Sequence, residues 1–235
     1  MIRTFCRLLL ASVLAVATSV ASTTHRVNAE QVNVLILGDS VASVLRWSPP
    51  SMKSLWKQPF AVTLEVWGCQ KLVDPGCLEG DKAQPSALEL LRKNREKNFD
   101  IVVVATGYND TGAPYLQRSI RRIHTEVKKQ GAQLLWLTYR ENGNVRIKAR
   151  TFNHVVKSQA KGLKFFVLDW EQISRKQKHW FTGDGVHMNA HGGVRLGNHI
   201  RRALDSIVAG QPIATTTTTT TSVPTTTTTT IVANG

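Results

Sequence analysis

Acidic residues are scarce in this sequence of 235 residues. Sixteen Asp and Glu stand against 30 Lys and Arg, which gives a formal net charge of +14 at pH 7. The basic clusters at 92–97 and 121–129 also lack the interleaved aromatic side chains that stack on bases. We therefore expect anionic cell-wall polymers or membrane surfaces as partners rather than nucleic acid. The alternative is that each cluster is an ordinary solvated helix face.

Long apolar runs are absent beyond the N-terminus, so no transmembrane span is expected in the mature chain. The N-terminal run, 8–20, follows Arg3 and Arg7 and precedes small residues at 27–29. It is shorter than the roughly 20 apolar residues of a spanning helix. A basic start, an apolar stretch and small residues are typical of a signal peptide, which we predict at 1–29, with a membrane anchor as the alternative.

Cleavage after this segment would leave 27 basic and 16 acidic residues, a net charge of +11. The mature protein is thus expected to be secreted or associated with the cell wall, and to remain strongly basic.

Cysteine is scarce as well, with three in the chain. Cys6 falls within the expected signal peptide, which leaves Cys69 and Cys77 as an even pair in an exported protein. The segment between them contains Asp-Pro-Gly at 74–76, a strong turn signal. We predict a Cys69–Cys77 disulfide, with two buried free thiols as the alternative. A metal site is not expected, because no CxxC motif or nearby histidine accompanies the pair.

The middle of the chain lacks the Pro- and Gly-rich composition of an interdomain linker, so one catalytic domain is predicted at 30–210. The following segment, 211–235, is almost pure threonine over 215–230. Such a composition cannot form a packed core. We expect a disordered spacer or stalk there, with threonines available for O-glycosylation.

Short apolar runs alternate with longer amphipathic segments through the predicted domain. The runs are expected to form strands at 32–37, 61–67, 101–106, 133–138 and 164–169. Segments with apolar residues three and four positions apart are expected to form helices at 86–97, 114–129, 145–161 and 190–208. This alternation predicts an α/β fold, a three-layer α/β/α sandwich around a five-stranded parallel sheet of the flavodoxin-like type.

The chemistry-bearing residues follow the ends of the predicted strands. Ser40 follows the first strand, Gly68 the second and Asn109 the third, while the loop 184–187 leads into the last helix. Ligands of open parallel sheets bind beyond the carboxyl ends of the strands, where the strand order reverses. We therefore expect a single active site at this rim.

Three of these residues match the needs of nucleophilic catalysis. A serine hydroxyl is a poor nucleophile near neutral pH, so it needs an imidazole to take its proton and a carboxylate to hold that imidazole. Ser40 is the candidate nucleophile, His187 the candidate base and Asp184 the candidate orienting acid.

Four sequence blocks, taken in order, resemble the SGNH, or GDSL-type, hydrolase family. They are Gly-Asp-Ser at 38–40, Gly68, Gly-Tyr-Asn-Asp at 107–110 and Asp-Gly-Val-His at 184–187. The resemblance covers nearly the whole predicted domain. It implies catalytic roles for Ser40, Asp184 and His187, and an oxyanion hole formed by the Ser40 N–H, the Gly68 N–H and the Asn109 side chain.

Each site residue also has a structural interpretation. Ser40 could cap the next helix, Gly68 could merely permit a turn, and Asn109 could stabilise a turn. Asp169, at the end of the fifth predicted strand, is a rival orienting acid, although Asp184 fits the family pattern. Further residues are expected to be structural, at the surface or in the core: Asp39, Asp110, His124, His154, His179, Trp180, Phe181, His191 and His199.

Together these features predict an exported serine esterase that removes a small acyl group, acetyl foremost, from an envelope or extracellular carbohydrate. The chemistry needs no metal and no organic cofactor. A Gly-Cys pair at 68–69 with a second cysteine soon after resembles the SGNH domains of envelope polysaccharide acyltransferases, whose multi-pass membrane part this chain lacks. The alternatives are therefore a polysaccharide or peptidoglycan O-acetyltransferase with the same triad, and a non-catalytic wall-binding module.

Overall fold

A computed structural model of the chain describes residues 31–214. The expected signal peptide, 1–29, and nearly all of the expected threonine-rich tail, 211–235, lie outside the described residues. Those two assignments stay predictions.

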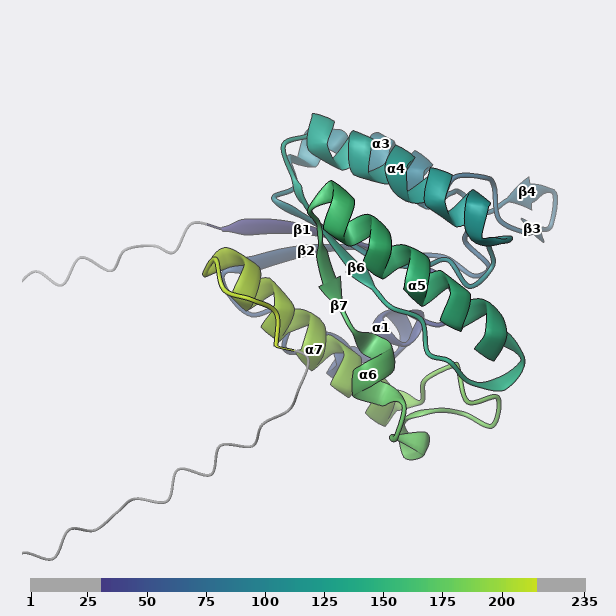
Figure 1. Ribbon diagram of the computed structural model, residues 1–235. Coiled ribbons are helices and arrows are strands. Elements are labelled where there is room, and N and C mark those ends of the chain that lie inside the picture. The colour runs from purple at the N-terminus through teal and green to yellow at the C-terminus, as the bar shows by residue number, and fades with distance from the viewer. Residues whose placement is uncertain (1–30, 215–235) are drawn as a thin grey trace, which may run out of the picture.

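A five-stranded parallel sheet forms the centre of the fold (Figure 1). Its order is β2-β1-β5-β6-β7, where the strands are β1 (Val32–Gly38), β2 (Phe60–Val66), β5 (Ile101–Ala105), β6 (Gln133–Leu137) and β7 (Phe166–Leu168). Every strand lies within two residues of its predicted position. The chain steps outward from β1 to β2 and then crosses back to β5, so the strand order reverses between β1 and β5.

Two layers of helices cover the sheet (Figure 1). One layer contains α3 (Ala87–Lys93), α4 (Ala113–Lys129) and α5 (Arg146–Leu163). The other contains α1 (Val44–Trp47), α2 (Pro49–Met52), α6 (Trp170–Ser174) and α7 (Ala190–Val208). This arrangement confirms the predicted three-layer α/β/α sandwich.

Several short elements have no counterpart among the predicted ones. They are the helices α1, α2 and α6, the 3₁₀ turns η2 (Gly143–Val145) and η3 (Lys178–Trp180), and a hairpin of β3 (Leu78–Glu79) and β4 (Lys82–Ala83). The helix expected at 86–97 ends at Lys93 and is followed by the 3₁₀ turn η1 (Arg95–Lys97). No helix among residues 31–214 is long and apolar enough to cross a membrane.

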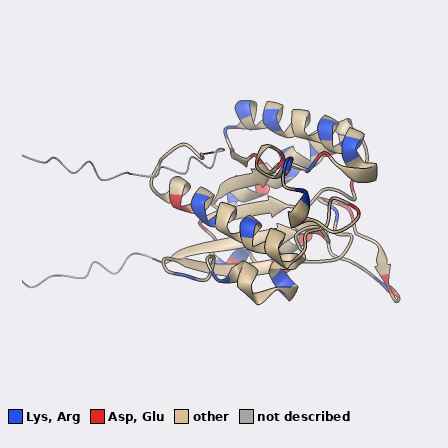
Figure 2. Cartoon of the chain, turned by 90° about the horizontal axis from the view of Figure 1, so that it is seen from below, with Lys and Arg blue, Asp and Glu red and all other residues tan. Residues whose placement is uncertain are grey.

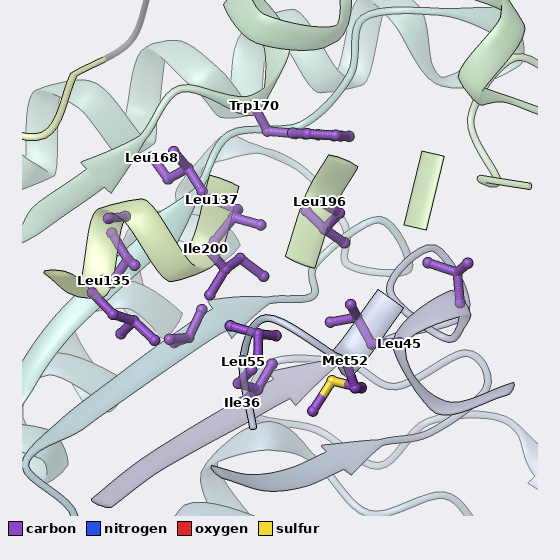
Figure 3. Close-up of a cluster of buried hydrophobic side chains, with 14 of the residues drawn as sticks. Ile36, Leu45, Met52, Leu55, Leu135, Leu137, Leu168, Trp170, Leu196 and Ile200 are labelled. Atoms are coloured by element: carbon purple, nitrogen blue, oxygen red, sulfur yellow. The ribbon is translucent and has the colours of Figure 1, made fainter. Parts of the chain in front are cut away.

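The sheet is buried on both faces, which divides the hydrophobic core into two clusters. Side chains of a strand alternate between faces, so Val34 and Ile36 join one cluster while Leu35 and Leu37 join the other. Figure 3 shows part of the first cluster, to which the sheet contributes Ile36 and Leu135 and α7 contributes Leu196 and Ile200. Strands buried on both sides read as continuous apolar runs, which is why the pattern predicted them well.

Trp180 and Phe181 pack in the first cluster, as expected of core residues. The predicted disulfide is also confirmed, since Cys69 and Cys77 are bonded with their Cα atoms 5.9 Å apart. It ties the start of the loop after β2 to the β3–β4 hairpin.

Candidate active site

Ser40 lies in the turn between β1 and α1, two residues beyond the end of the strand. Its Oγ is 3.0 Å from Nε2 of His187, a residue 147 positions away in the chain. The side chain does not cap the following helix, because the N-cap of α1 is Ser43. The hydroxyl of Ser40 is therefore free to engage the imidazole.

Asp184 and His187 belong to a tight loop between η3 and α7. The backbone pairs Phe181 with Met188 across the base of this loop, and Asn189 caps α7 immediately after it. The Asp184 Oδ2 lies 2.5 Å from the Nδ1 of His187, which fixes the ring with Nε2 toward Ser40. The three side chains thus form one continuous hydrogen-bonded chain from carboxylate to hydroxyl.

The carboxylate of Asp184 is held in its ionised form by its own loop. Its Oδ1 accepts hydrogen bonds from the N–H groups of Val186 and His187 at 2.8 and 2.9 Å and from the Thr182 hydroxyl at 3.1 Å. Partial burial opposes ionisation, but these bonds and the one from the His187 ring outweigh it. They hold the pKa of Asp184 well below its usual value.

Asp39, next to the nucleophile, is fully buried and cross-links two loops. One oxygen accepts from the Val41 N–H, and the other accepts from the N–H groups of Gly107 and Tyr108 at 3.1 and 3.2 Å and from the Thr106 hydroxyl. Burial raises the pKa of Asp39, while these hydrogen bonds oppose the rise. The expected structural role of Asp39 is thus to tie the turn after β1 to the turn after β5.

Asn109 and Asp110 extend these ties to the loop after β2. Asn109 donates from Nδ2 to the Gln70 carbonyl at 3.1 Å, and the Asp110 carboxyl accepts from the Leu72 N–H at 3.2 Å. The turn begins at Gly107 with φ of +134°, a conformation that favours glycine. Burial raises the pKa of Asp110 to about 7. The amide of Asn109 keeps a second N–H that can serve a ligand.

Gly68 lies at the same end of the sheet, since Gly38 of β1 is in register with Val66 of β2. It is exposed, and a Cβ added to it would meet no atom within 4 Å, so the space beside its Cα is open.

The predicted residues meet at a groove of about 530 Å³, which is lined by Ser40, Asn109, Asp184 and His187 together with the 143–145 turn. Gly68 is not among the residues that line this groove. Four of the five predicted residues therefore line one groove, and Gly68 lies at the same end of the sheet.

Arg140 is a residue that the sequence interpretation missed. It follows β6, is only 1% exposed, and donates from Nε to the carbonyl of Gly185 at 2.8 Å and from Nη1 to that of Ser174. Its guanidinium also lies 3.8 Å from the centre of the Phe181 ring. Arg140 thus holds the Asp184–His187 loop against the sheet. Its place directly after a predicted strand was the one available signal.

Lys148 is a second such residue. From the first turn of α5 its ammonium donates to the Tyr108 carbonyl at 2.6 Å, beside Asn109. This contact places a positive charge at the rim of the site.

The other candidates lie away from Ser40. Asp169 caps α6 and binds the Thr138 hydroxyl and the Lys157 ammonium, so it does not orient His187. His199 is buried beside Trp170, and burial lowers its pKa to about 4. Within residues 31–214 no cluster of three or more His, Cys, Asp or Glu side chains is placed to hold a metal ion.

No family model matches the chain, and no curated protein matches its sequence. Solved structures do match it. A carbohydrate acetylesterase family member from Sinorhizobium meliloti aligns with a TM-score of 0.61 at 17% identity, over 77% of this chain and 100% of that one. TesA aligns with a TM-score of 0.56 at 19% identity, over 71% and 94%. A GDSL-like lipase from Bacteroides thetaiotaomicron aligns with a TM-score of 0.55 at 15% identity, over 74% and 88%. The chain therefore has the fold of the SGNH, or GDSL-type, hydrolases.

Proposed function

We propose that the protein is an exported serine esterase that removes small acyl groups, acetyl foremost, from an envelope or extracellular carbohydrate. The observation that carries this proposal is the hydrogen-bonded chain from Asp184 through His187 to Ser40, at the rim where the strand order reverses. A serine placed in this way is activated without any further group.

In the acylation step, His187 Nε2 takes the Ser40 proton as Oγ attacks the ester carbonyl. Asp184 holds the ring tautomer in which Nδ1 carries a proton, and it stabilises the imidazolium that forms. The tetrahedral intermediate collapses when His187 returns the proton to the leaving alcohol. Ser40 is left as its acyl ester.

In the deacylation step, His187 takes a proton from water, whose oxygen attacks the acyl carbon. Collapse of the second intermediate returns the proton to Ser40 and releases the acid. The negative oxygen of both intermediates would accept hydrogen bonds from the N–H groups of Ser40 and Gly68 and from the second N–H of the Asn109 amide. Each such donor is worth about 3 to 4 kcal/mol in the transition state.

Export and the class of substrate rest on separate observations. The signal-peptide pattern at 1–29 and the Cys69–Cys77 disulfide both fit an oxidising compartment outside the cytoplasm. The similarity to a carbohydrate acetylesterase family member supports an acylated carbohydrate as the substrate. The groove that contains Ser40 is open to solvent, which suits an ester carried on a larger molecule.

The direct test is hydrolysis of a short aryl acetate by the parent chain and by a Ser40→Ala variant. We expect Ser40→Ala to reduce kcat by about 10⁴-fold or more, with an unchanged melting temperature. Ser158→Ala, which removes an exposed hydroxyl on α5, is the matched control and should retain full activity. Retention of most activity by Ser40→Ala would contradict the proposal.

Two further measurements address the substrate. A series of aryl esters of increasing acyl length should show the highest kcat/KM for acetyl. An acetylated polysaccharide incubated with the enzyme should yield free acetate. Acetate that appears only on an added acceptor glycan would instead identify an acyltransferase with the same triad.

A further inference from the structure

The net positive charge is distributed unequally between the two helical layers. Helices α3, α4 and α5 carry twelve Lys and Arg and two acidic residues, whereas α1, α2, α6 and α7 carry four and two. Helix α5 alone has five basic residues and no acid. In Figure 2 the blue Lys and Arg segments recur along the helices and outnumber the red acidic ones. The α3–α5 layer therefore accounts for most of the charge of the domain.

The basic side chains of this layer form stripes along the exposed sides of α4 and α5. On α5, Arg146, Arg150, Lys157 and Lys161 follow one another at spacings of four, seven and four residues, which brings them to one side of the helix. At about 1.5 Å per residue, that stripe is roughly 22 Å long. Helices α4 and α5 pack side by side, so the two stripes form one surface.

Few of these charges are neutralised within the described part of the chain. Arg150 pairs with Glu141 and Lys157 with Asp169, while Arg121 binds the neutral Gln159. The remaining exposed cations have no acidic partner within 4.0 Å in residues 31–214: Arg118, Arg122, Lys128, Lys129, Arg146 and Lys161. A surface that serves solubility alone mixes both signs, because single-sign fields attract counter-charged molecules.

The stripe on α5 begins at the active-site groove. The turn that lines the groove, 143–145, runs directly into Arg146, and Lys148 contacts the Tyr108 carbonyl at the rim. A chain-like ligand that follows α5 would therefore pass from the basic surface to Ser40.

The positions of the exposed apolar residues decide what kind of anion fits. Membrane-binding surfaces combine basic residues with apolar side chains that insert into the lipid. Here Trp47 and Trp56, 55% and 62% exposed, belong to the α1–α2 region on the other side of the sheet. Ile147 is the one large apolar side chain of α4 and α5 that is markedly exposed. A single aliphatic side chain is a weak lipid anchor, and no exposed large aromatic side chain accompanies it on α4 or α5, so the surface suits neither a bilayer nor single-stranded nucleic acid.

We propose that the α4–α5 surface binds a linear acidic polysaccharide with closely spaced carboxylate groups. This site is separate from the catalytic groove and goes beyond esterase activity. Binding would release counterions from the polymer, so affinity should fall steeply with salt concentration.

The test measures binding of the full chain, carrying Ser40→Ala so that turnover plays no part, to polygalacturonate. Dextran is the neutral polymer control. The surface variant combines Arg118→Gln, Arg122→Gln, Lys129→Gln and Lys161→Gln. The matched control removes four exposed lysines from the other side of the sheet, with Lys53→Gln, Lys57→Gln, Lys176→Gln and Lys178→Gln. Both variants lose the same charge.

We expect polygalacturonate to bind and dextran not to bind. The surface variant should bind roughly tenfold more weakly or worse and show a shallower dependence on salt, while the matched control keeps most of the parent affinity. Unfolding curves confirm that both variants are folded. Equal weakening of the two variants, or no binding by the parent, would overturn the proposal. Tighter binding to phosphatidylglycerol vesicles or to a single-stranded oligonucleotide would also overturn it, by assigning another occupant.

Discussion

The two halves of the candidate site are built in opposite ways. The half that contains Ser40 and Asn109 rests on buried carboxyl groups, since Asp39 is 0% and Asp110 2% exposed. The half that contains Asp184 and His187 is an exposed loop, whose two side chains are 49% and 45% exposed. Short-range hydrogen bonds within that loop hold its side chains in place, whereas the carboxyl groups of the other half are held in the protein interior.

Because of this difference, the groups that position the site residues contribute to fold stability in one half but not in the other. In the Ser40 half, the carboxyl groups that align the loops also join the ends of β1, β2 and β5, so a change there affects both folding and the site. In the His187 half, the loop is attached to the domain through Arg140 and the start of α7. We therefore expect changes in the exposed half to reduce activity with little loss of stability, and loss of the hydrogen bonds in the buried half to reduce both.

The largest effect is expected for Asp184→Asn. The Asn oxygen can still accept from the backbone of the loop, but its amide group would face Nδ1 of His187 and favour the wrong ring tautomer. We expect kcat to fall by about 10⁴-fold with a melting temperature close to that of the parent. The measurement is aryl acetate hydrolysis beside thermal unfolding, with the exposed Asp81→Asn as control. A drop in activity that only accompanies unfolding would contradict the contrast between the halves.

Asp39→Asn should have the next largest effect, and on stability first. Its carboxyl oxygens face N–H donors on both sides, so an amide group must meet either the Val41 N–H or those of Gly107 and Tyr108. We expect a loss of about 2 to 4 kcal/mol in the free energy of unfolding, measured by urea titration. Activity should fall as well, because the turn that carries Asn109 loses its anchor. An Asp39→Asn protein with parent-like stability would show that these hydrogen bonds are dispensable.

The sequence predicted the fold, and the grouping of Ser40, Asp184 and His187, for identifiable reasons. Strands buried on both faces appear as apolar runs, and the amphipathic pattern of 190–208 coincides with α7. The helices α1 and α2 are only four residues long and pack against α7, so no periodicity could reveal them. Arg140 could not be assigned either, because its contacts join three segments that only the fold brings together.

Arg140→Met breaks the link between the exposed loop and the rest of the domain. The methionine fills much of the same volume but cannot donate to the carbonyls of Gly185 and Ser174. We expect kcat to fall by about 10- to 100-fold with little change in KM, because His187 is displaced while the groove persists. Arg95→Met, at an exposed arginine of η1, is the control. Partial recovery with Arg140→Lys would support a positioning role, whereas a KM increase with unchanged kcat would contradict it.

The smallest effect is expected for Asp110→Asn, and it depends on pH. Burial raises the pKa of Asp110 from 3.8 to about 7, and the charge of Asp39 acts in the same direction. Hydrogen bonds from Leu72 and Tyr115 and the charge of Lys71 lower this pKa but do not offset the burial. Between these two values the folded protein binds more protons at this group than the unfolded chain does. The contribution of Asp110 to stability therefore declines as the pH rises through that window.

Asparagine does not titrate, and its oxygen can still accept from the Leu72 N–H. The Asp110→Asn variant should thus gain stability relative to the parent between about pH 4 and about pH 8, by a few degrees in melting temperature. Asp81→Asn, in the exposed hairpin, should follow the parent across the same range. Parallel curves for Asp110→Asn and the parent would mean that burial does not perturb this carboxyl group. Hydrogen bonds of its own loop keep the pKa of Asp184 low. If burial did not raise the pKa of Asp110, the two halves of the site would differ in exposure but not in how they control the ionisation of their carboxyl groups.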